Sequence, residues 1–266
     1  MSIESSADLE ALREVSRVTR LTLAALEAAV RPGVTTAALD RVAAELFTRE
    51  GARSAPALEY GFPGTVLISI NDEIAHGIPG PRRLVEGDLV SLDVTVEKNG
   101  YVADAARSVV VGTGSAVAHK LVEAARAAFE AGLAVVRAGT RVNAIGKAVD
   151  REVRRRGFRG VRGLAGHGVG RKIHEEPSVP NHYDPWQTDV LADGMVITIE
   201  PMLTAGSANP LRRRRRLDHP HRRPQPGGAR RAHHHRDPRH ADRADGGVTM
   251  ATAGVVLVRR IHPAVA

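Results

Sequence analysis

The chain contains no cysteine. Disulfide frameworks, thiolate metal sites and cysteine nucleophiles are therefore excluded, and any metal ion must be held by His, Asp or Glu. Long apolar runs are also missing, since the longest, such as 195–199 and 255–258, are far shorter than the roughly 20 residues of a membrane-spanning helix. The N-terminus carries no basic and then apolar export signal. We expect a protein of the reducing cytoplasm that does not interact with a membrane.

Lysine, glutamate and aromatic residues are absent after residue 206, although the preceding part of the chain uses all three. The net charge of +8 comes from this last part, because residues 207–245 hold 12 Arg against 4 Asp. Two different compositions are thus joined in one chain. We predict a core-bearing domain over 1–206 that is incomplete at its C-terminus, followed over 207–266 by an Arg/His/Pro-rich tail that is disordered or out of frame.

The first 206 residues alternate between helical and strand patterns. Apolar residues spaced by three and four predict helices, and runs rich in β-branched residues predict strands. We expect helices over 8–30, from Thr35 or Thr36 to Gly51, over 116–137 and over 142–156, and strands over 65–70, 89–96 and 101–111. This mixture indicates an α/β fold with helices flanking sheets.

The two predicted helical pairs resemble each other. Segment 30–51 matches segment 136–157, with the glycines that end the matching turns and helices displaced by 106 positions in both cases. A duplication predicts two related halves about a pseudo-twofold axis, with a cleft between their sheets. Chance similarity of two Ala-rich helical hairpins is the alternative.

Two aspartates lie in a predicted hairpin around the turn 97–100. The side-chain period of two places Asp93 and Asp104 on one face, either opposite or diagonal to each other. An apolar strand does not normally bury an unpaired acid, and a hard or borderline cation would remove the difficulty by accepting oxygen from both. The alternative is one solvated Asp and one that caps a turn.

Two further segments carry residues suited to metal binding. His167 stands between glycines, which allow close backbone approach and give the ring little apolar packing. Glu200 ends the apolar strand 195–199, where a carboxylate is costly unless a cation meets it. Three carboxylates and one histidine suit Mn, Fe, Co or Zn, and two ions could share them. His76 taken alone is most simply a loop histidine.

Four motifs occur together in the first 206 residues: SINDEIAHGIPG at 69–80, SLDVTVEKNGYVADAARS at 91–108, GHGVGRKIHEEP at 166–177 and ITIEPM at 197–202. In this order and spacing they resemble the type I methionine aminopeptidases over residues 7–206. The resemblance implies the pita-bread fold, a site for two divalent metal ions (Co, Mn, Fe or Zn), and hydrolytic removal of the initiator methionine from nascent polypeptides.

The resemblance also implies roles for individual residues. It assigns four metal ligands: Asp93, Asp104, His167 and Glu200. His76 and His174 would contact the substrate and stabilise the reacting carbonyl, while Glu200 would carry the proton when water or hydroxide attacks the first peptide carbonyl. Tyr60 and Phe62 fall in the segment that contributes to the methionine pocket.

The chain departs from the family pattern after residue 200. The resemblance implies a further bridging glutamate in a Glu-His-Thr motif, yet no glutamate follows Glu200. We therefore expect weakened metal binding and doubtful activity for the chain as written. A frameshift near 206–211 accounts for the tail, because GC-rich codons read out of frame yield Arg, Pro, Ala, Gly and His. One shifted nucleotide allows segment 217–219 to encode Trp-Thr-Ile and segment 231–233 to encode Glu-His-Thr.

Other functions stay open from the sequence. The tail can instead be a genuine basic arm that binds RNA or ribosomal phosphates on a non-catalytic pita-bread protein, although it lacks aromatics for base stacking and nucleic acid is the less favoured partner. A prolidase-like peptidase shares the fold but usually carries an extra N-terminal domain, for which we expect no room before Asp8. We further expect a monomer, with the ribosome as a possible partner. Residues 207–247 should not pack on the domain, whereas 255–258 can pair with the sheet edge left open.

Overall fold

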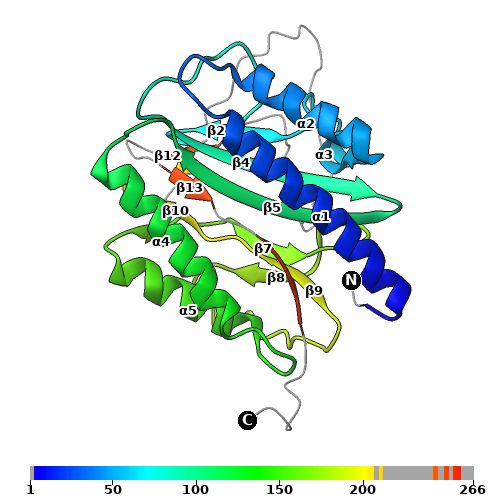
Figure 1. Cartoon of the computed structure of the whole chain (residues 1–266). Helices are drawn as coiled ribbons and strands as arrows, with labels where there is room; N and C mark the ends of the chain where they lie inside the picture. Colours follow the sequence, from blue (N-terminus) through cyan, green and yellow to red (C-terminus); the bar gives the residue numbers. More distant parts are fainter. Residues whose placement is uncertain (1–2, 207–209, 212–241, 245–248, 252–253, 259–266) are drawn as a thin grey trace, which may run out of the picture.

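The computed structural model describes residues 3–206, 210–211, 242–244, 249–251 and 254–258. They form two halves, each with a pair of long helices and an antiparallel sheet (Figure 1). The α/β architecture of two related halves is therefore confirmed. Within these residues, no helix combines the length and the apolar character needed to cross a membrane.

The first half contains the N-terminal helices and a sheet centred on one long strand. Its elements are α1 (Ser6–Ala29), α2 (Thr36–Glu50), β1 (Arg53–Ser54), α3 (Ala55–Tyr60), β2 (Leu67–Ile70), β3 (Glu73–Ala75), β4 (Leu89–Lys98) and β5 (Tyr101–Val110). Strand β4 pairs antiparallel with β1, β2 and β5. The Ser5 side chain caps α1 by accepting from the backbone N–H of Asp8, whose carboxylate in turn accepts from the backbone N–H of Ser5.

The second half repeats this plan with another helical pair. Its elements are α4 (Ala116–Leu133), α5 (Val142–Arg155), β6 (Arg159–Gly160), β7 (Ala165–Gly168), β8 (Glu175–Pro180), β9 (Val196–Ile199) and β10 (Met202–Thr204). Gly51 after α2 and Gly157 after α5 both have positive φ, 63° and 81°. The equivalent helices thus end at a glycine in the same left-handed backbone conformation, which agrees with a duplicated helical pair.

Short strands from beyond residue 206 complete the sheets: β11 (Pro210–Leu211), β12 (Asp242–Ala244), β13 (Thr249–Ala251) and β14 (Gly254–Leu257). Strand β14 pairs with β9, which confirms the expected pairing of this run with the open edge. Strand β12 pairs with β3 and with β11. The expectation that 207–247 packs nowhere is therefore wrong for these two strands, because backbone pairing satisfies an open edge whatever the side chains. Segments 217–219 and 231–233 lie outside the described residues.

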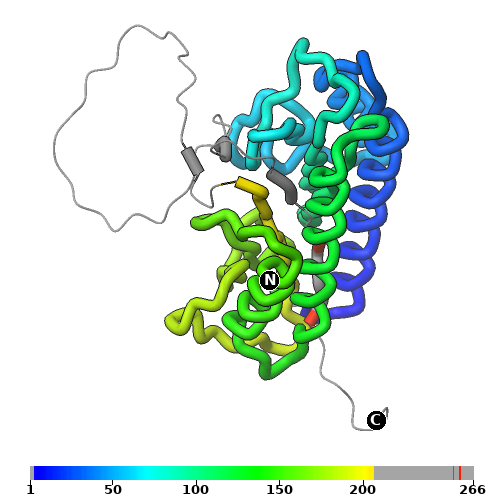
Figure 2. The backbone as a smooth tube through the Cα atoms, turned by 90° about the vertical axis from the view of Figure 1, so that its left-hand side faces the viewer, coloured from blue at the N-terminus to red at the C-terminus, as the bar shows by residue number. Residues whose placement is uncertain are grey.

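Each half has its own apolar core beneath its helices. In the first half, Val15, Val18 and Leu26 of α1 are buried in the cluster that contains the apolar residues of β4. In the second, Leu121 of α4 and Ile145 of α5 lie in the cluster that contains Ile197 and Ile199 of β9. Helices α1 and α4 run side by side along one side of the molecule (Figure 2). The long helices thus cover one side of the sheets and leave the opposite side for the site.

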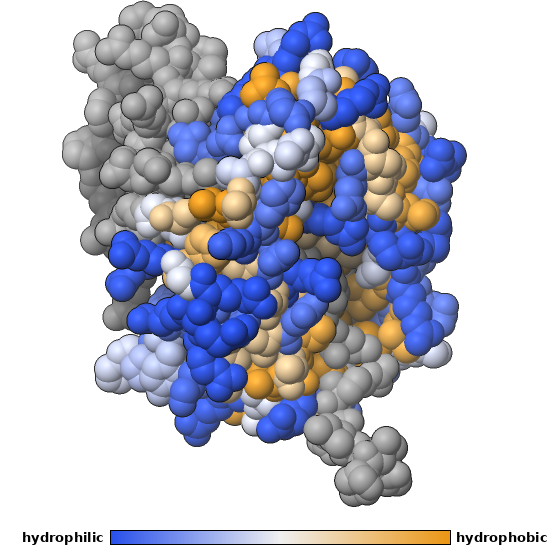
Figure 3. Space-filling view, turned by 60° about the vertical axis from the view of Figure 1, so that its left-hand side comes forward, coloured by the Kyte–Doolittle hydropathy of each residue, from blue (hydrophilic) through white to orange (hydrophobic). Residues whose placement is uncertain are grey.

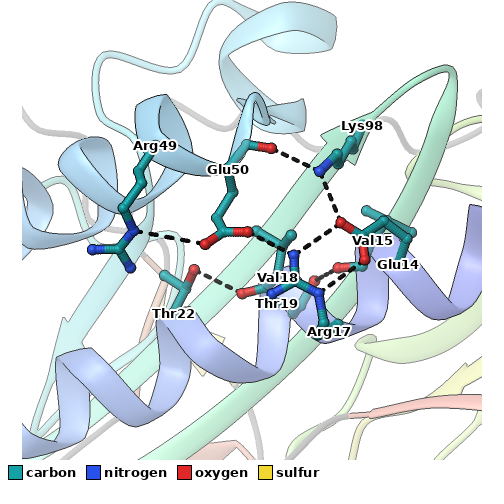
Figure 4. Close-up of polar contacts among 9 residues, drawn as sticks. All are labelled: Glu14, Val15, Arg17, Val18, Thr19, Thr22, Arg49, Glu50 and Lys98. Carbon is teal, nitrogen blue, oxygen red and sulfur yellow. Dashed lines mark hydrogen bonds and ion pairs between the residues drawn. The ribbon is translucent and has the colours of Figure 1, made fainter.

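An ion-pair network joins α1, α2 and β4 (Figure 4). Arg17 donates to Glu14 at 2.8 Å and to Glu50 at 2.6 Å, and Lys98 donates to Glu14 at 2.9 Å and to the Glu50 carbonyl at 2.7 Å. The hydrogen bond from Arg17, followed by that from Lys98, lowers the pKa of Glu14 to about 2. The face drawn in Figure 3 carries hydrophilic residues with several hydrophobic areas among them.

Candidate metal centre and substrate cavity

The β4–β5 hairpin places two carboxylates on one face of the first sheet. Thr95 lies opposite Asp104 and Asp93 lies opposite Ala106, so the aspartates are diagonal neighbours on the same face. The turn between the strands is the two-residue Asn99-Gly100, both with positive φ, which is the geometry of a tight hairpin. The expectation that Asp93 and Asp104 share one face is confirmed, and β4 runs two residues closer to the turn than predicted.

The second sheet brings His167 and Glu200 to the same point. His167 lies in β7 and Glu200 follows β9 directly. The His167 Nε2 atom is 3.0 Å from Glu200 Oε1 and 3.7 Å from Asp104 Oδ2. One ligand atom from each of these three buried residues lies within 4.8 Å of the others, and within the described part of the chain they form one group that could hold a metal ion.

The electrostatics of this group are those of crowded acids with one nearby cation. Burial, followed by the charge of Asp104, raises the pKa of Asp93 well above its ordinary value. Burial and the charge of Glu200 raise the pKa of Asp104 to about 7. Burial acts in the same upward direction on Glu200, but the adjacent His167 outweighs it and lowers the pKa of Glu200. The positive charge near these buried carboxylates is therefore too small to balance them, and a divalent cation would supply what is missing.

The orientation of the His167 ring fits a metal ligand. Its Nδ1 atom lies 2.8 Å from the Gly168 carbonyl, which can only accept, so Nδ1 carries a hydrogen and donates it. In the neutral ring, the lone pair is then on Nε2, facing Asp104 and Glu200. A backbone carbonyl that fixes the tautomer in this way is the usual support of a metal-binding histidine. The donor set of one imidazole nitrogen and carboxylate oxygens thus fits a divalent ion.

A cavity of about 520 Å³ opens onto the ligand group. All six charged or histidine residues that the motifs single out line it: His76, Asp93, Asp104, His167, His174 and Glu200. Tyr60 also lines it, and its hydroxyl lies 2.6 Å from His174 Nδ1. Phe62 is buried and is not among the described lining residues. A larger groove between α1, β5 and α4 holds no comparable ligand group among the described residues.

The loop that carries His174 is fastened on both sides. Arg171 stacks on the Tyr101 ring at 3.6 Å and donates to Tyr101 Oη at 2.6 Å and to Asp8 Oδ1 at 3.1 Å. The backbone N–H of Ile173 donates to Glu59 Oε1 at 2.9 Å. These contacts tie the loop to α1, to β5 and to α3. They restrict the positions that His174 can adopt beside the cavity.

Three polar residues of the site escaped the sequence analysis. The hydroxyl of Thr95 donates to Asp104 at 3.1 Å, that of Thr198 donates to Glu200 at 2.6 Å, and the Asn181 amide donates to the Glu200 carbonyl at 2.7 Å. Each threonine lies two positions from a carboxylate on the same strand face, in Asp93-Val94-Thr95 and Thr198-Ile199-Glu200. This spacing is the signal that could have found the two threonines. Asn181 carries no such signal, since only the fold brings it to Glu200.

Residues 10–235 of the sequence match the model of a protein family that is described as metallopeptidase family M24. It is 39% identical over 206 residues to methionine aminopeptidase 2 of Bacillus subtilis (strain 168), covering 77% of this chain and 83% of that protein. The structure is similar to that of methionine aminopeptidase from Rickettsia prowazekii, with a TM-score of 0.85 and 27% identity over 98% of this chain and 97% of the other. It shares the fold of the prolidase from Pyrococcus furiosus, with a TM-score of 0.70 and 19% identity over 97% of this chain and 63% of the other.

Proposed function

The chain belongs to metallopeptidase family M24 and is similar in sequence to methionine aminopeptidases, and we propose that it removes the N-terminal methionine from polypeptides by metal-dependent hydrolysis. The observation that carries this proposal is the convergence of Asp104, His167 and Glu200, whose ligand atoms lie within 4.8 Å of one another beside a substrate-sized cavity. The pita-bread fold supports it, because the two halves meet at this point.

The residues that would hold metal are the four that the sequence motifs predict. Asp104, His167 and Glu200 would hold one divalent ion, and Asp93 with Asp104 would contribute to a second, with Co, Mn, Fe or Zn as candidates. When bound, such ions supply a Lewis acid for the peptide carbonyl and lower the pKa of the attacking water. The excess of buried carboxylates over cations supports this assignment.

The remaining residues of the cavity would bind substrate and move protons. Glu200 would carry the proton from the attacking water to the leaving amine through Oε2, because Oε1 accepts from Thr198. His174, held by Tyr60, and His76 would donate to the substrate carbonyl and stabilise its developing charge. Tyr60 and Phe62 are proposed to shape the methionine pocket.

The level of activity is a separate proposal. No glutamate follows Glu200, so the chain as written lacks the further bridging ligand that the family resemblance implies. We propose that it binds metal more weakly, and turns over more slowly, than a chain with this glutamate restored. Substrates would be the N-termini of nascent polypeptides in the cytoplasm. Ribosome association and a monomeric state stay predictions.

Peptide cleavage tests the proposed function. The purified chain is stripped with EDTA, reloaded with Co²⁺ or Mn²⁺, and incubated with a Met-Ala-Ser peptide while free methionine is measured. We expect methionine release only with metal, and a loss of about 100-fold or more in His167→Ala. The matched control is His119→Ala, because His119 is an exposed histidine of α4 outside the cavity. Release unaffected by EDTA or by His167→Ala would contradict the proposal.

A further inference from the structure

One buried hydroxyl lies between two residues of the ligand group. Thr198, on β9, is fully buried. Its Oγ1 accepts from the backbone N–H of His167 at 2.9 Å and lies 2.6 Å from Glu200 Oε1. Because a carboxylate oxygen only accepts, the hydroxyl hydrogen goes to Glu200, and the 3.4 Å separation from the His167 carbonyl is the weaker alternative. The same oxygen is therefore bonded to the strand that carries His167 and to the side chain of Glu200.

The main chain on both sides of the Thr198–Glu200 hydrogen bond is closely held. A Cβ atom at Gly166 would lie 2.4 Å from the Thr198 carbonyl oxygen, so a glycine is needed for β7 and β9 to come this close. The Asn181 amide holds the Glu200 carbonyl at 2.7 Å and thereby fixes the main chain of Glu200. The side chain of Glu200 can still rotate about its own bonds. The hydrogen bond from Thr198 and the contact with His167 Nε2 at 3.0 Å restrict that rotation.

We propose that Thr198 is a positioning residue that holds the Glu200 carboxylate and the His167 strand in one arrangement and thereby sets the metal affinity of the site. The inference rests on the proposed function, since it presumes that these residues bind metal. Hydrogen bonds to a carboxylate are among the stronger ones in proteins, and their loss in a buried site leaves an oxygen unsatisfied. Partners that orient a metal ligand typically contribute about 10- to 100-fold in metal affinity.

Three variants separate the hydroxyl from the packing. Thr198→Val keeps the shape and removes the hydroxyl, and Thr198→Ser keeps the hydroxyl and removes a methyl group. Thr22→Val is the matched control, because Thr22 is also fully buried but its hydroxyl donates only to the Val18 carbonyl of its own helix, at 2.9 Å. If Thr198→Val does not fold, Thr198→Ala removes the hydroxyl without adding bulk.

The measurements are Co²⁺ affinity of the EDTA-treated chain by calorimetry and the visible spectrum of the Co²⁺-loaded protein, which reports the arrangement of the ligands. We expect Thr198→Ser and Thr22→Val to stay within about 3-fold of the parent affinity. Thr198→Val, or Thr198→Ala, should bind about 10- to 100-fold more weakly with an altered spectrum. Parent-like affinity and spectrum in the variant without the hydroxyl would overturn the role of Thr198, and so would equal losses in Thr198→Ser and Thr198→Val. A parent chain that binds no Co²⁺ would instead overturn the metal site and the proposed function with it.

Discussion

The Nε2 atom of His167 lies 3.0 Å from Oε1 of Glu200, so the imidazole of the ligand group points at a buried carboxylate. In the metal-free protein this contact favours a proton on Nε2. Burial lowers the pKa of His167, but the charges of Glu200 and Asp104 outweigh it and raise the value to about 9. The proton on Nε2 thus competes with the cation for the same electron pair.

Metal-free protein should lose stability as the pH rises. The charged form of His167 stabilises the fold fully below its ordinary pKa of 6.5, and this contribution is lost as the pH passes through about 9. Asp104 acts in the same direction at lower pH, because its pKa is raised from 3.8 to about 7 in the folded protein. The stability that its bound proton provides is therefore lost as the pH rises through about 7. Urea midpoints at pH 6, 7.5 and 9 in EDTA should therefore decrease.

Two comparisons isolate the cause of this decrease. The decrease between pH 6 and pH 9 should be smaller in His167→Gln, and Mn²⁺ should stabilise the parent chain most at the higher pH, where protons no longer compete. His119→Ala should behave as the parent. A metal-free midpoint that rises with pH over this interval would contradict the account of the cluster.

Gly166→Ala should destabilise the second sheet. The added Cβ would lie 2.4 Å from the Thr198 carbonyl oxygen, a backbone atom that cannot move without separating β7 from β9. We expect a loss of about 1–3 kcal/mol in the free energy of unfolding, measured by urea denaturation. Gly160→Ala is the control, because its Cβ would meet nothing within 4 Å and its free energy should change little. Equal effects of the two substitutions would argue against the close approach of β7 and β9 at Gly166.

Arg171→Ala should lower peptidase activity more than it lowers stability. The change removes the contacts of Arg171 with Tyr101 and Asp8 and frees one side of the loop that carries His174. We expect kcat/KM on Met-Ala-Ser to decrease about 3- to 10-fold. Arg126→Ala is the control, since that exposed arginine pairs only with Glu130 on the same helix face. Unchanged kcat/KM in Arg171→Ala would show that the loop is held without it.

Restoring the reading frame near 206–211 should increase activity. The restored tail would contain the Glu-His-Thr motif, and its glutamate would add a carboxylate to the metal site. We expect kcat/KM on Met-Ala-Ser with Co²⁺ or Mn²⁺ to increase about 10-fold or more over the chain as written. Equal turnover by the two versions would show that the missing glutamate does not limit the enzyme.

The predictable features are those set by local periodicity. The spacing of apolar residues gives α1 and α5 within about two residues, and the alternation of strand side chains places Asp93 and Asp104 on one face. Four residues were predicted to converge, and three of them, Asp104, His167 and Glu200, bring ligand atoms within 4.8 Å of one another. That prediction came from the internal repeat and from buried acids without partners in the sequence, together with the family resemblance, because no local pattern joins segments of the chain so far apart. The assignment of these residues as ligands stays a prediction.

The features that escaped prediction depend on contacts between distant segments. Asn181 reaches the Glu200 carbonyl only because β8 and β9 both pack against β7. Arg171, Tyr101 and Asp8 come from three separate segments, and although two of them lie in the motifs, nothing in the sequence shows that they contact one another. The pairing of β12 with β3 was missed for a different reason, since the charged sequence around 242–244 argues against a strand unless an edge is available.

Anomalous X-ray diffraction from crystals soaked in Mn²⁺ tests the central claim most directly. We expect a manganese peak among Asp104, His167 and Glu200, at about 2.0–2.2 Å from His167 Nε2 and from the nearest carboxylate oxygens, and its disappearance in His167→Ala. A peak elsewhere on the protein, or a cavity that stays without manganese at saturating concentration, would contradict it.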